Sequence, residues 1–303
     1  MNVTERLPLV SVIMSMRNSA STVGAAVRSV QLQSLCDWEL IVIDNGSTDQ
    51  SSSIVSSFGD KRIRLVREQQ STGLATRLNQ AVDLARADLI ARMDADDVCF
   101  PERLARQVAR LREEPQLDLV SCGAVVFTSD GELVGELPVG LDHQDIVARP
   151  FMGFPFPHPT WCGRAVWFRS NPYDSRLRYA EDQDLLLRSF RHSRFGALDK
   201  VLLGYRQDQL SLKKLLPGRA TFMASLCRHA LGTGEFLPML SGLTNQVAKG
   251  LVDITTVGFG LNRPMQQYRL KSVSPAIAPA WQELRKRVLA LNSSAANLGP
   301  CAV

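Results

Sequence analysis

The sequence predicts an α/β fold with a mostly parallel, Rossmann-like central sheet flanked by helices, followed by a mainly helical C-terminal extension. In the first 125 residues, short apolar runs alternate with helical patterns of about a dozen residues. Such alternation is typical of parallel strands joined by crossover helices. Residues 128–180 are instead rich in proline and aromatic residues, which predicts irregular loops and strands that could wall a substrate pocket. After residue 210 the patterns are helical but interrupted by prolines.

Each predicted strand is a short apolar run that ends at polar or turn-forming residues. The clearest covers residues 39–44 and ends at Asn45-Gly46, a pair that favours a turn. The helices are predicted from apolar residues at helical spacing, such as Val23, Val27 and Val30. Strands are expected at 10–14, 39–44, 63–66, 89–93 and 117–127, and helices at 22–33, 49–57, 74–86, 101–111, 181–191, 213–231, 236–257 and 281–291.

Charge is distributed unevenly along the chain. Residues 1–200 contain 23 Lys and Arg against 26 Asp and Glu, a balance of −3, whereas residues 201–303 contain 12 against 4, a balance of +8. The basic third favours either an anionic partner, such as a membrane surface, or a solvated face without a partner. It lacks a dense Lys and Arg run with interleaved aromatics, so no nucleic acid partner is expected.

Three further features narrow the class of protein. No run of about 18 apolar residues predicts a membrane-spanning helix. Because the N-terminus lacks a signal-peptide pattern, we expect a cytoplasmic protein, with peripheral contact of residues 211–303 on the inner face of the membrane as an option. The six cysteines show neither a CxxC pair nor zinc-ligand spacing, which favours reduced thiols over a zinc site or disulfide framework.

The acidic segment from Asp94 to Asp97 follows a predicted strand. Its three carboxylates, Asp94, Asp96 and Asp97, repel one another unless a cation lies between them. Such oxygen ligands suit Mg²⁺ or Mn²⁺, which commonly bridge to phosphate oxygens. The alternative is an acidic surface turn in which Asp97 caps the next helix. The strand-end position favours the metal site, since parallel sheets bind ligands beyond the carboxyl ends of their strands.

Two other polar segments carry candidate chemistry. The segment IDNGSTD (43–49) follows a strand, and its Asp44 or Asn45 can bond a nucleobase or ribose; the alternative is a turn with a helix cap. The segment EDQD (181–184) begins a predicted helix, where the macrodipole favours acids. In a partly apolar pocket, one of these carboxylates can instead act as a general base.

Taken together, these segments resemble the inverting family-2 glycosyltransferases of the GT-A fold. The resemblance covers about residues 8–210 and implies a glycosyltransferase domain over 1–210, with a nucleotide-sugar half at 1–127, an acceptor half at 128–210, and a basic helical extension at 211–303. The matching stretches, in the family's order, are VSVIMSMRN (10–18), QSLCDWELIVIDNGSTD (33–49), TGLATRLNQAV (72–82), ARMDADDVCFPERLARQV (91–108), HPT (158–160), AEDQDLLLRS (180–189) and LGYR (203–206).

The resemblance implies roles for single residues. Asp182 matches the catalytic base, and Glu181 and His158 match the acceptor side, with a structural role in a proline-rich loop as the alternative for His158. Asp96 matches the ligand of a Mn²⁺ or Mg²⁺ cofactor. Nucleotide contacts are implied for Ser15, Asn18, Asp44, Asn45 and Asp94. Asn45 occupies a position where many members of the family have Asp. Arg77 and Arg206 are weaker candidates for the phosphates.

The implied reaction moves a sugar from a nucleotide-sugar donor, with a UDP-sugar as first choice, to a hydroxyl of a saccharide or lipid-linked acceptor in cell-surface polysaccharide biosynthesis. One displacement, assisted by the base, inverts the anomeric centre. Two alternatives stay open. A sugar-phosphate nucleotidyltransferase normally carries a glycine-rich phosphate loop, and residues 10–20 contain no glycine. A non-catalytic nucleotide-sugar-binding module would be expected to have lost the acids that this chain keeps.

Overall fold

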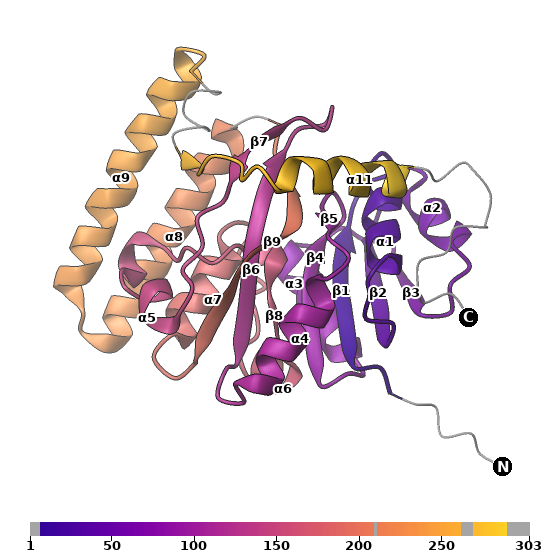
Figure 1. Cartoon of the computed structure of the whole chain (residues 1–303). Coiled ribbons are helices and arrows are strands. Elements are labelled where there is room, and N and C mark those ends of the chain that lie inside the picture. Colours follow the sequence, from indigo (N-terminus) through magenta and orange to yellow (C-terminus); the bar gives the residue numbers. More distant parts are fainter. Residues whose placement is uncertain (1–6, 209–210, 262–268, 290–303) are drawn as a thin grey trace.

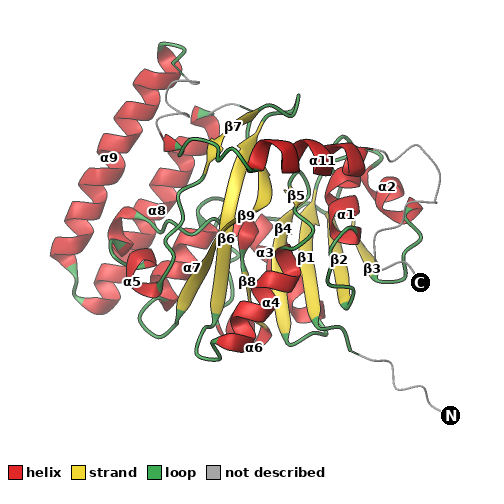
Figure 2. Cartoon of the chain, viewed as in Figure 1, coloured by secondary structure: helices red, strands yellow, loops and turns green. Residues whose placement is uncertain are grey.

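The computed structural model describes residues 7–208, 211–261 and 269–289. Its centre is a mixed sheet with helices on both faces (Figures 1 and 2), so the predicted α/β class is confirmed. Among the described residues the strand order is β3-β2-β1-β4-β8-β6-β9-β5, with β7 paired to β6. The strands are β1 (Val10–Met16), β2 (Trp38–Asn45), β3 (Ile63–Glu68), β4 (Leu89–Asp94), β5 (Val98–Cys99), β6 (Leu119–Phe127), β7 (Leu133–Glu136), β8 (Cys162–Arg164) and β9 (Phe195–Arg206).

The N-terminal half of the sheet is parallel, with β1 between β2 and β4. Strands β1, β2 and β4 bury both faces, as expected where helices cover a parallel sheet, whereas the edge strand β3 is only partly buried. Successive side chains point to opposite faces. Val12 and Met14 therefore pack with α1, α2 and α4, whereas Ile13 packs with α3. The helices of the molecule are α1 (Val23–Gln31), α2 (Ser51–Ser57), α3 (Leu74–Leu84), α4 (Arg103–Glu113), α5 (His143–Ile146), α6 (Ala165–Ser170), α7 (Glu181–Ser189), α8 (Leu212–Thr233), α9 (Phe236–Gly258) and α11 (Ile277–Leu289).

The second half of the sheet mixes strand directions. Strand β8 runs antiparallel to both β4 and β6, and β6 runs parallel to β9. The sequence does not predict β9, because the exposed Asp199 and Lys200 interrupt its apolar pattern in the middle. This strand brings Arg206 back to the carboxyl end of β4, next to the acidic cluster.

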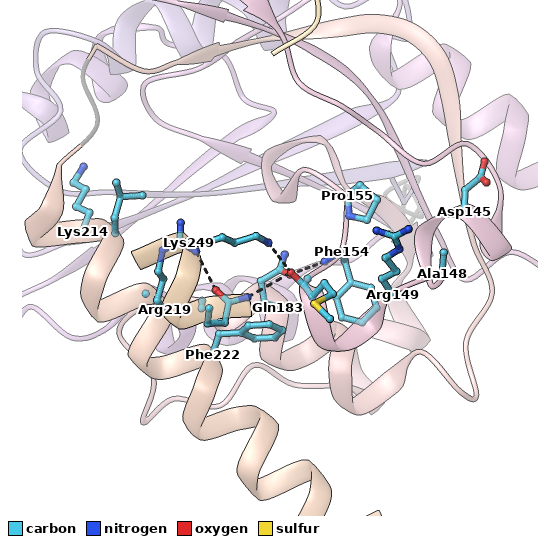
Figure 3. Close-up of a pocket in the computed structure, with 16 residues that line it drawn as sticks. Asp145, Ala148, Arg149, Phe154, Pro155, Gln183, Lys214, Arg219, Phe222 and Lys249 are labelled. Carbon is cyan, nitrogen blue, oxygen red and sulfur yellow. Dashed lines mark hydrogen bonds between the residues drawn. The ribbon is translucent and has the colours of Figure 1, made fainter. Parts of the chain in front are cut away.

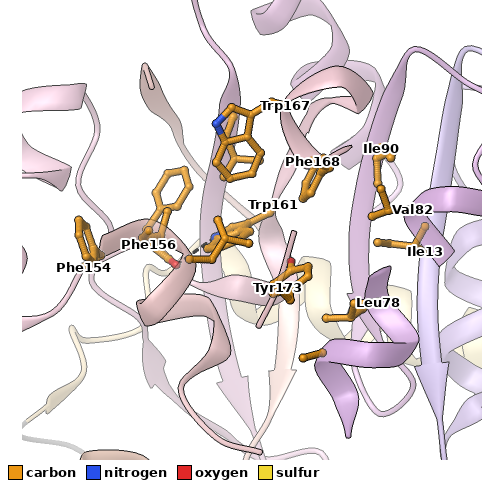
Figure 4. Packing of buried hydrophobic residues seen from close by; sticks show 14 of the residues in the cluster. Ile13, Leu78, Val82, Ile90, Phe154, Phe156, Trp161, Trp167, Phe168 and Tyr173 are labelled. Carbon is orange, nitrogen blue, oxygen red and sulfur yellow. Dashed lines mark hydrogen bonds between the residues drawn. The ribbon is translucent and has the colours of Figure 1, made fainter. Parts of the chain in front are cut away.

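The proline-rich segment 128–180 forms only short strands, helices and 3₁₀ turns. Most of its aromatic side chains pack into one core with apolar residues of β1 and α3 (Figure 4). Phe156 contacts Trp161 and Phe195 with ring centroids 5.8 and 5.6 Å apart. The indole N–H of Trp161 donates to the carbonyl of Phe156 at 3.1 Å, and that of Trp167 donates to Ser193 at 2.8 Å. These rings fix the loops that hold the site.

The C-terminal helices make two separate contacts with the sheet domain. Helices α8 and α9 form a hairpin that turns at Gly234, where a φ of 78° favours glycine. The hairpin packs against α7 and the 3₁₀ turn at 150–152. Helix α11 lies across the other side, beside α1 (Figure 1), and its Trp281 packs on Phe100 and Phe127. The described part of the extension is therefore helical, as predicted.

Two expectations about the whole chain can be compared with the structure. In the part of the chain that is described, no helix combines the length and apolar character that a membrane crossing needs. Cys99, Cys122, Cys162 and Cys227 are free thiols, as expected. Cys36 is disulfide-bonded, so the expectation of reduced thiols is wrong at that position. Spacing along the sequence cannot reveal a pair that only folding brings together.

Candidate active site

The site forms where β1, β2 and β4 end on the same edge of the sheet. Ser15 of β1 lies opposite Asp94 of β4, and its neighbour Met16 lies opposite Asp44 of β2. The register therefore brings Ser15, Asp94 and Asp44, from three separate segments, to one edge of the sheet, as the strand-end rule requires. A cavity of about 470 Å³ opens there, and its wall includes Ser15, Asn18, Asp94, Asp96 and Arg206.

Three carboxylates cluster at the end of β4. Oxygen atoms of Asp94, Asp96 and Asp97 lie within 4.8 Å of one another. The pKa of Asp96 is raised to about 6, since the recess holds its carboxylate partly away from water and the Asp94 charge is close. Burial, together with the charges of Asp94 and Asp96, raises the pKa of Asp97 well above its usual range. The arrangement favours a bound cation, which would relieve this repulsion.

Asp97 gives an independent indication of a ligand. Its Oδ1 accepts from the backbone N–H of Arg206 at 2.9 Å, but its buried Oδ2 has no hydrogen-bond partner among the described residues. A buried carboxylate oxygen without a partner is costly. Together with two nearby carboxylates, it makes an oxygen donor set that fits Mg²⁺ or Mn²⁺.

Arg92 is a buried cation that the sequence reasoning missed. Its guanidinium pairs with Asp94 at 2.5 Å, and its Nε and Nη1 have no hydrogen-bond partner within the described chain. Although burial opposes the charge, the nearby Asp94, Tyr173, Asp97 and Glu181 raise the pKa of Arg92. It therefore balances acids from β4 and from α7. The available signal was an arginine two residues before Asp94, on the same face of an otherwise apolar strand.

The acids of α7 begin at a strained residue. Ala180 adopts a left-handed conformation with a φ of 52°, unusual for a side chain with Cβ, and the helix starts at Glu181. Glu181 is buried, while Asp182 is half-buried and accepts from Gln183 Nε2 at 3.2 Å. Asp184 is tied to Arg188 and Arg228, at 2.8 and 3.1 Å, so it supports the fold.

Both leading acids of α7 hold their protons more tightly than free carboxyls. Burial and the neighbouring Asp182 charge raise the pKa of Glu181 to about 7. Burial also raises the pKa of Asp182, against the opposing effects of Gln183 and Arg92. A carboxylate with a raised pKa is a stronger base, which suits proton abstraction near neutral pH.

Asp44 and Asn45 lie at the end of β2 but use their polar atoms within the protein. Asp44 accepts from Ser47 N at 2.9 Å and from the Ser52 hydroxyl. Asn45 exchanges two hydrogen bonds of 2.8 Å with the backbone of Thr72 and accepts from Arg77 Nε at 2.9 Å. Neither is in the described wall of the cavity. Their nucleotide contacts, and the phosphate contact of Arg77, stay predictions.

Asn18 and His158 are held in different ways. Asn18, with a φ of 50°, accepts from Thr48 N at 2.8 Å and thereby joins the loops after β1 and β2 beside the cavity. His158 is buried, with its Nε2 2.8 Å from the Tyr173 hydroxyl and its ring 4.6 Å from that of Trp161. Burial and Arg92 hold the pKa of His158 well below its usual range, so it is neutral. The structural role left open for it has direct support, and its acceptor-side role stays a prediction.

Comparison with known families gives one match. Residues 11–163 match the sequence profile of Glycosyl transferase family 2. The matched region contains the acidic cluster of β4 and the loop after β1, and it ends before α7 begins.

Comparison with curated proteins gives glycosyltransferases as relatives. The chain is 35% identical to the putative glycosyltransferase EpsE of Bacillus subtilis over 214 residues, which are 68% of this chain and 76% of EpsE. It is 29% identical to the O-antigen biosynthesis glycosyltransferase WbnJ of Escherichia coli, over 69% of this chain and 83% of WbnJ. Over 34% of this chain and 41% of the relative, it is 35% identical to the Escherichia coli UDP-Glc:alpha-D-GlcNAc-diphosphoundecaprenol beta-1,3-glucosyltransferase WfgD.

Comparison with solved structures confirms the GT-A-like fold. S. aureus TarS 1–349 in complex with UDP aligns with a TM-score of 0.60 at 18% identity, over 94% of this chain and 81% of that one. The mannosyltransferase PcManGT of Pyrobaculum calidifontis, in complex with GDP-Man and Mn²⁺, aligns with a TM-score of 0.58 at 16% identity, over 95% and 88%.

Proposed function

Because the chain belongs to glycosyltransferase family 2, we propose that it transfers a sugar, with inversion, from a UDP-sugar to a hydroxyl of a saccharide or lipid-linked acceptor. The observation that carries the proposal is the position of Arg92, whose charge acts on acids from both β4 and α7. A cluster suited to a metal and diphosphate thus lies within electrostatic range of a pair of basic carboxylates. Nucleotide-sugar transfer needs both.

The donor half of the proposal rests on Asp94, Asp96 and Asp97, which would hold Mn²⁺ or Mg²⁺. The bound cation would neutralise negative charge that grows on the leaving diphosphate. The orphaned Asp97 oxygen supports this, as does the fold likeness to a mannosyltransferase whose structure contains GDP-Man and Mn²⁺. Ser15, Asn18 and Arg206 line the same cavity and would contact the nucleotide and its phosphates.

The acceptor half rests on Asp182. Its carboxylate would take the proton of the acceptor hydroxyl as that oxygen bonds to the anomeric carbon, while the bond from this carbon to the diphosphate oxygen breaks. The nucleoside diphosphate leaves with the electron pair, and a single displacement inverts the centre. Glu181 would orient the loop or the acceptor, and Arg92 would stabilise the negative charge beside both acids.

The biological setting is proposed from the relatives. WbnJ is named for O-antigen biosynthesis, and WfgD is named for an acceptor linked to diphosphoundecaprenol. Cell-surface polysaccharide synthesis in the cytoplasm, at the inner face of the membrane, follows as the proposed role. The described face of α9 supports this, because its exposed large side chains are all apolar, at Phe236, Leu237, Leu240, Val247, Leu251, Val252 and Ile254.

Calorimetric titration of the full chain with UDP and UDP-sugars tests the proposed donor site. We expect binding with Mn²⁺ and little with chelator, and an Asp96→Ala variant that binds at least about tenfold more weakly. Asp208→Ala is the matched control, since Asp208 lines the same cavity outside the carboxylate cluster. Equal affinity for the nucleotide with Mn²⁺ and with chelator would refute the metal requirement. In a separate assay of the reaction products, release of pyrophosphate in place of nucleoside diphosphate would indicate a nucleotidyltransferase.

A further inference from the structure

A second cavity, of about 650 Å³, lies between the start of α7 and the α8–α9 hairpin (Figure 3). We propose that it binds the phosphate groups of an acceptor whose sugar is attached to a lipid diphosphate. This inference rests on the proposed function and adds to it a site, a set of residues and the chemistry of the acceptor.

The cavity is built from four segments that are distant in the sequence. Its walls come from residues 145–155, from the start of α7, and from the facing sides of α8 and α9. Phe154 and Phe222 contribute apolar side chains to its wall, and the basic residues Arg149, Lys214 and Lys249 line it from separate segments (Figure 3). Arg149 and Lys214 are exposed, and Lys249 is half-buried. Such convergence of a few charged groups on an apolar pocket is typical of a ligand site.

The charges of this cavity are unbalanced. Arg149, Lys214 and Lys249 have no carboxylate within ion-pair distance among the described residues, and Lys249 donates only to a neutral carbonyl, that of Met152, at 3.1 Å. Arg219 also lines the cavity but is paired with the buried Asp253 at 2.6 Å. Asp145 is the one acid in the described wall. The excess of positive charge selects an anion.

The crowding of positive charge around Lys249 supports this. Its side chain is half-buried, and burial together with the nearby Arg219 and Arg269 lowers its pKa, against the opposing effect of Asp253. An anion in the cavity would offset the positive charge of Lys249 and of the neighbouring arginines. Lysine ammonium groups bind phosphate as point charges, and an arginine adds a planar pair of donors. The set therefore suits a phosphate or diphosphate.

A single side chain connects the cavity to the proposed base. Gln183 lines the cavity, accepts from Phe154 N at 2.8 Å and donates to Asp182 Oδ2 at 3.2 Å. A ligand whose phosphate lies in the cavity can thus present its next sugar on the Asp182 side of Gln183. The cavity is therefore on the acceptor side, and the acids of β4 are left to the donor.

Helix α9 favours a lipid as the source of the phosphate. Its two charged side chains face inward: Lys249 lines the cavity, and Asp253 is fully buried and paired with Arg219 and Arg269. Its outward face carries the exposed leucines, valines and isoleucine instead. An amphiphile with its phosphates in the cavity could lay its chain along this apolar face. A soluble phosphate would make no use of that face.

Binding can be measured without catalysis. In an Asp96→Ala background with chelator, which weakens the donor site, inorganic pyrophosphate is titrated calorimetrically into the full chain. We expect Lys214→Gln combined with Lys249→Gln to weaken binding at least about tenfold. Lys213→Gln is the matched control, because Lys213 is the exposed neighbour of Lys214 outside the cavity. No binding in the background, or an equal loss in the control, would overturn the proposal.

A second arm identifies the source of the phosphate. Farnesyl diphosphate should bind more tightly than inorganic pyrophosphate, and Leu251→Ser should remove only that difference. Equal binding of the two probes would assign the cavity to a soluble phosphate and overturn the lipid-linked acceptor. Because neither arm depends on transfer, loss of donor binding or transfer would contradict the proposed function and leave this result standing.

Discussion

Replacement of Asp182 by Asn is the most direct test of the proposed chemistry. The carboxylate is half-buried and accepts one described side-chain hydrogen bond, from Gln183 at 3.2 Å. Asparagine keeps the shape and an acceptor oxygen for Gln183, so the free energy of unfolding should change by no more than about 1 kcal/mol. It cannot accept the hydroxyl proton. Transfer should therefore slow by ~10²–10⁴-fold, which corresponds to about 3–5 kcal/mol in the activation barrier.

The assay measures nucleoside diphosphate release at saturating donor and metal, with and without acceptor. Donor affinity should be unchanged in Asp182→Asn, so that the loss falls on the transfer step. Glu181→Gln is the matched control, since it removes the adjacent carboxylate and should slow transfer by about tenfold or less. Turnover near that of the wild type in Asp182→Asn would refute Asp182 as the base. A larger loss in Glu181→Gln would assign the role to Glu181 instead.

Three further predictions concern stability and the membrane. The pKa of Glu181 is raised from 4.5 to about 7, so its protonation stabilises the fold fully below about pH 4.5, and this stabilisation is lost as the pH rises through 7. Between pH 5 and 8, the free energy of unfolding in urea should therefore fall in the wild type by up to about 3 kcal/mol more than in Glu181→Gln. A Cβ at Gly242 would lie 2.6 Å from a carbonyl oxygen, so Gly242→Ala should destabilise by about 1–3 kcal/mol, whereas Gly258→Ala, with nothing within 4 Å, should not. In co-sedimentation with anionic vesicles, Leu251→Ser should weaken binding by about tenfold, whereas the control Leu231→Ser, at an even more exposed leucine of α8, should not; equal losses would contradict docking through α9.

The fold was predictable where local patterns are strong. Strands β1, β2 and β4 read as apolar runs because the sheet buries both of their faces, and α1 and α4 read as helices because one face of each meets that sheet. Strand β9 was missed because Asp199 and Lys200 are exposed at its middle. The short elements of 128–180 have too few residues to establish a period.

The site was predictable only in part, for a related reason. Asp94 and Asp96 stood out because acids directly after a buried strand are unusual. Arg92 did not, since its importance depends on Glu181, which lies about 90 residues later and acts on Arg92 from a different element. Gln183 is similar, because its links to Phe154 and Asp182 exist only after the loop at 150–155 folds against α7. Contacts between remote segments leave no periodic signal in the sequence.

Helix α9 shows why a helix can be predicted while its orientation cannot. Its apolar residues recur at helical spacing, and such a stripe normally faces the core. In this protein Met239 and Leu243 pack on the core, but much of the inward face is small or polar: Gly242 lets the helix approach the turn at 150–152 closely, and Asp253 is buried between Arg219 and Arg269. Exposed apolar area disfavours the water-facing state by ~25 cal/mol per Å². The proposed lipid contact along α9 would remove this cost, because it would cover the exposed apolar face.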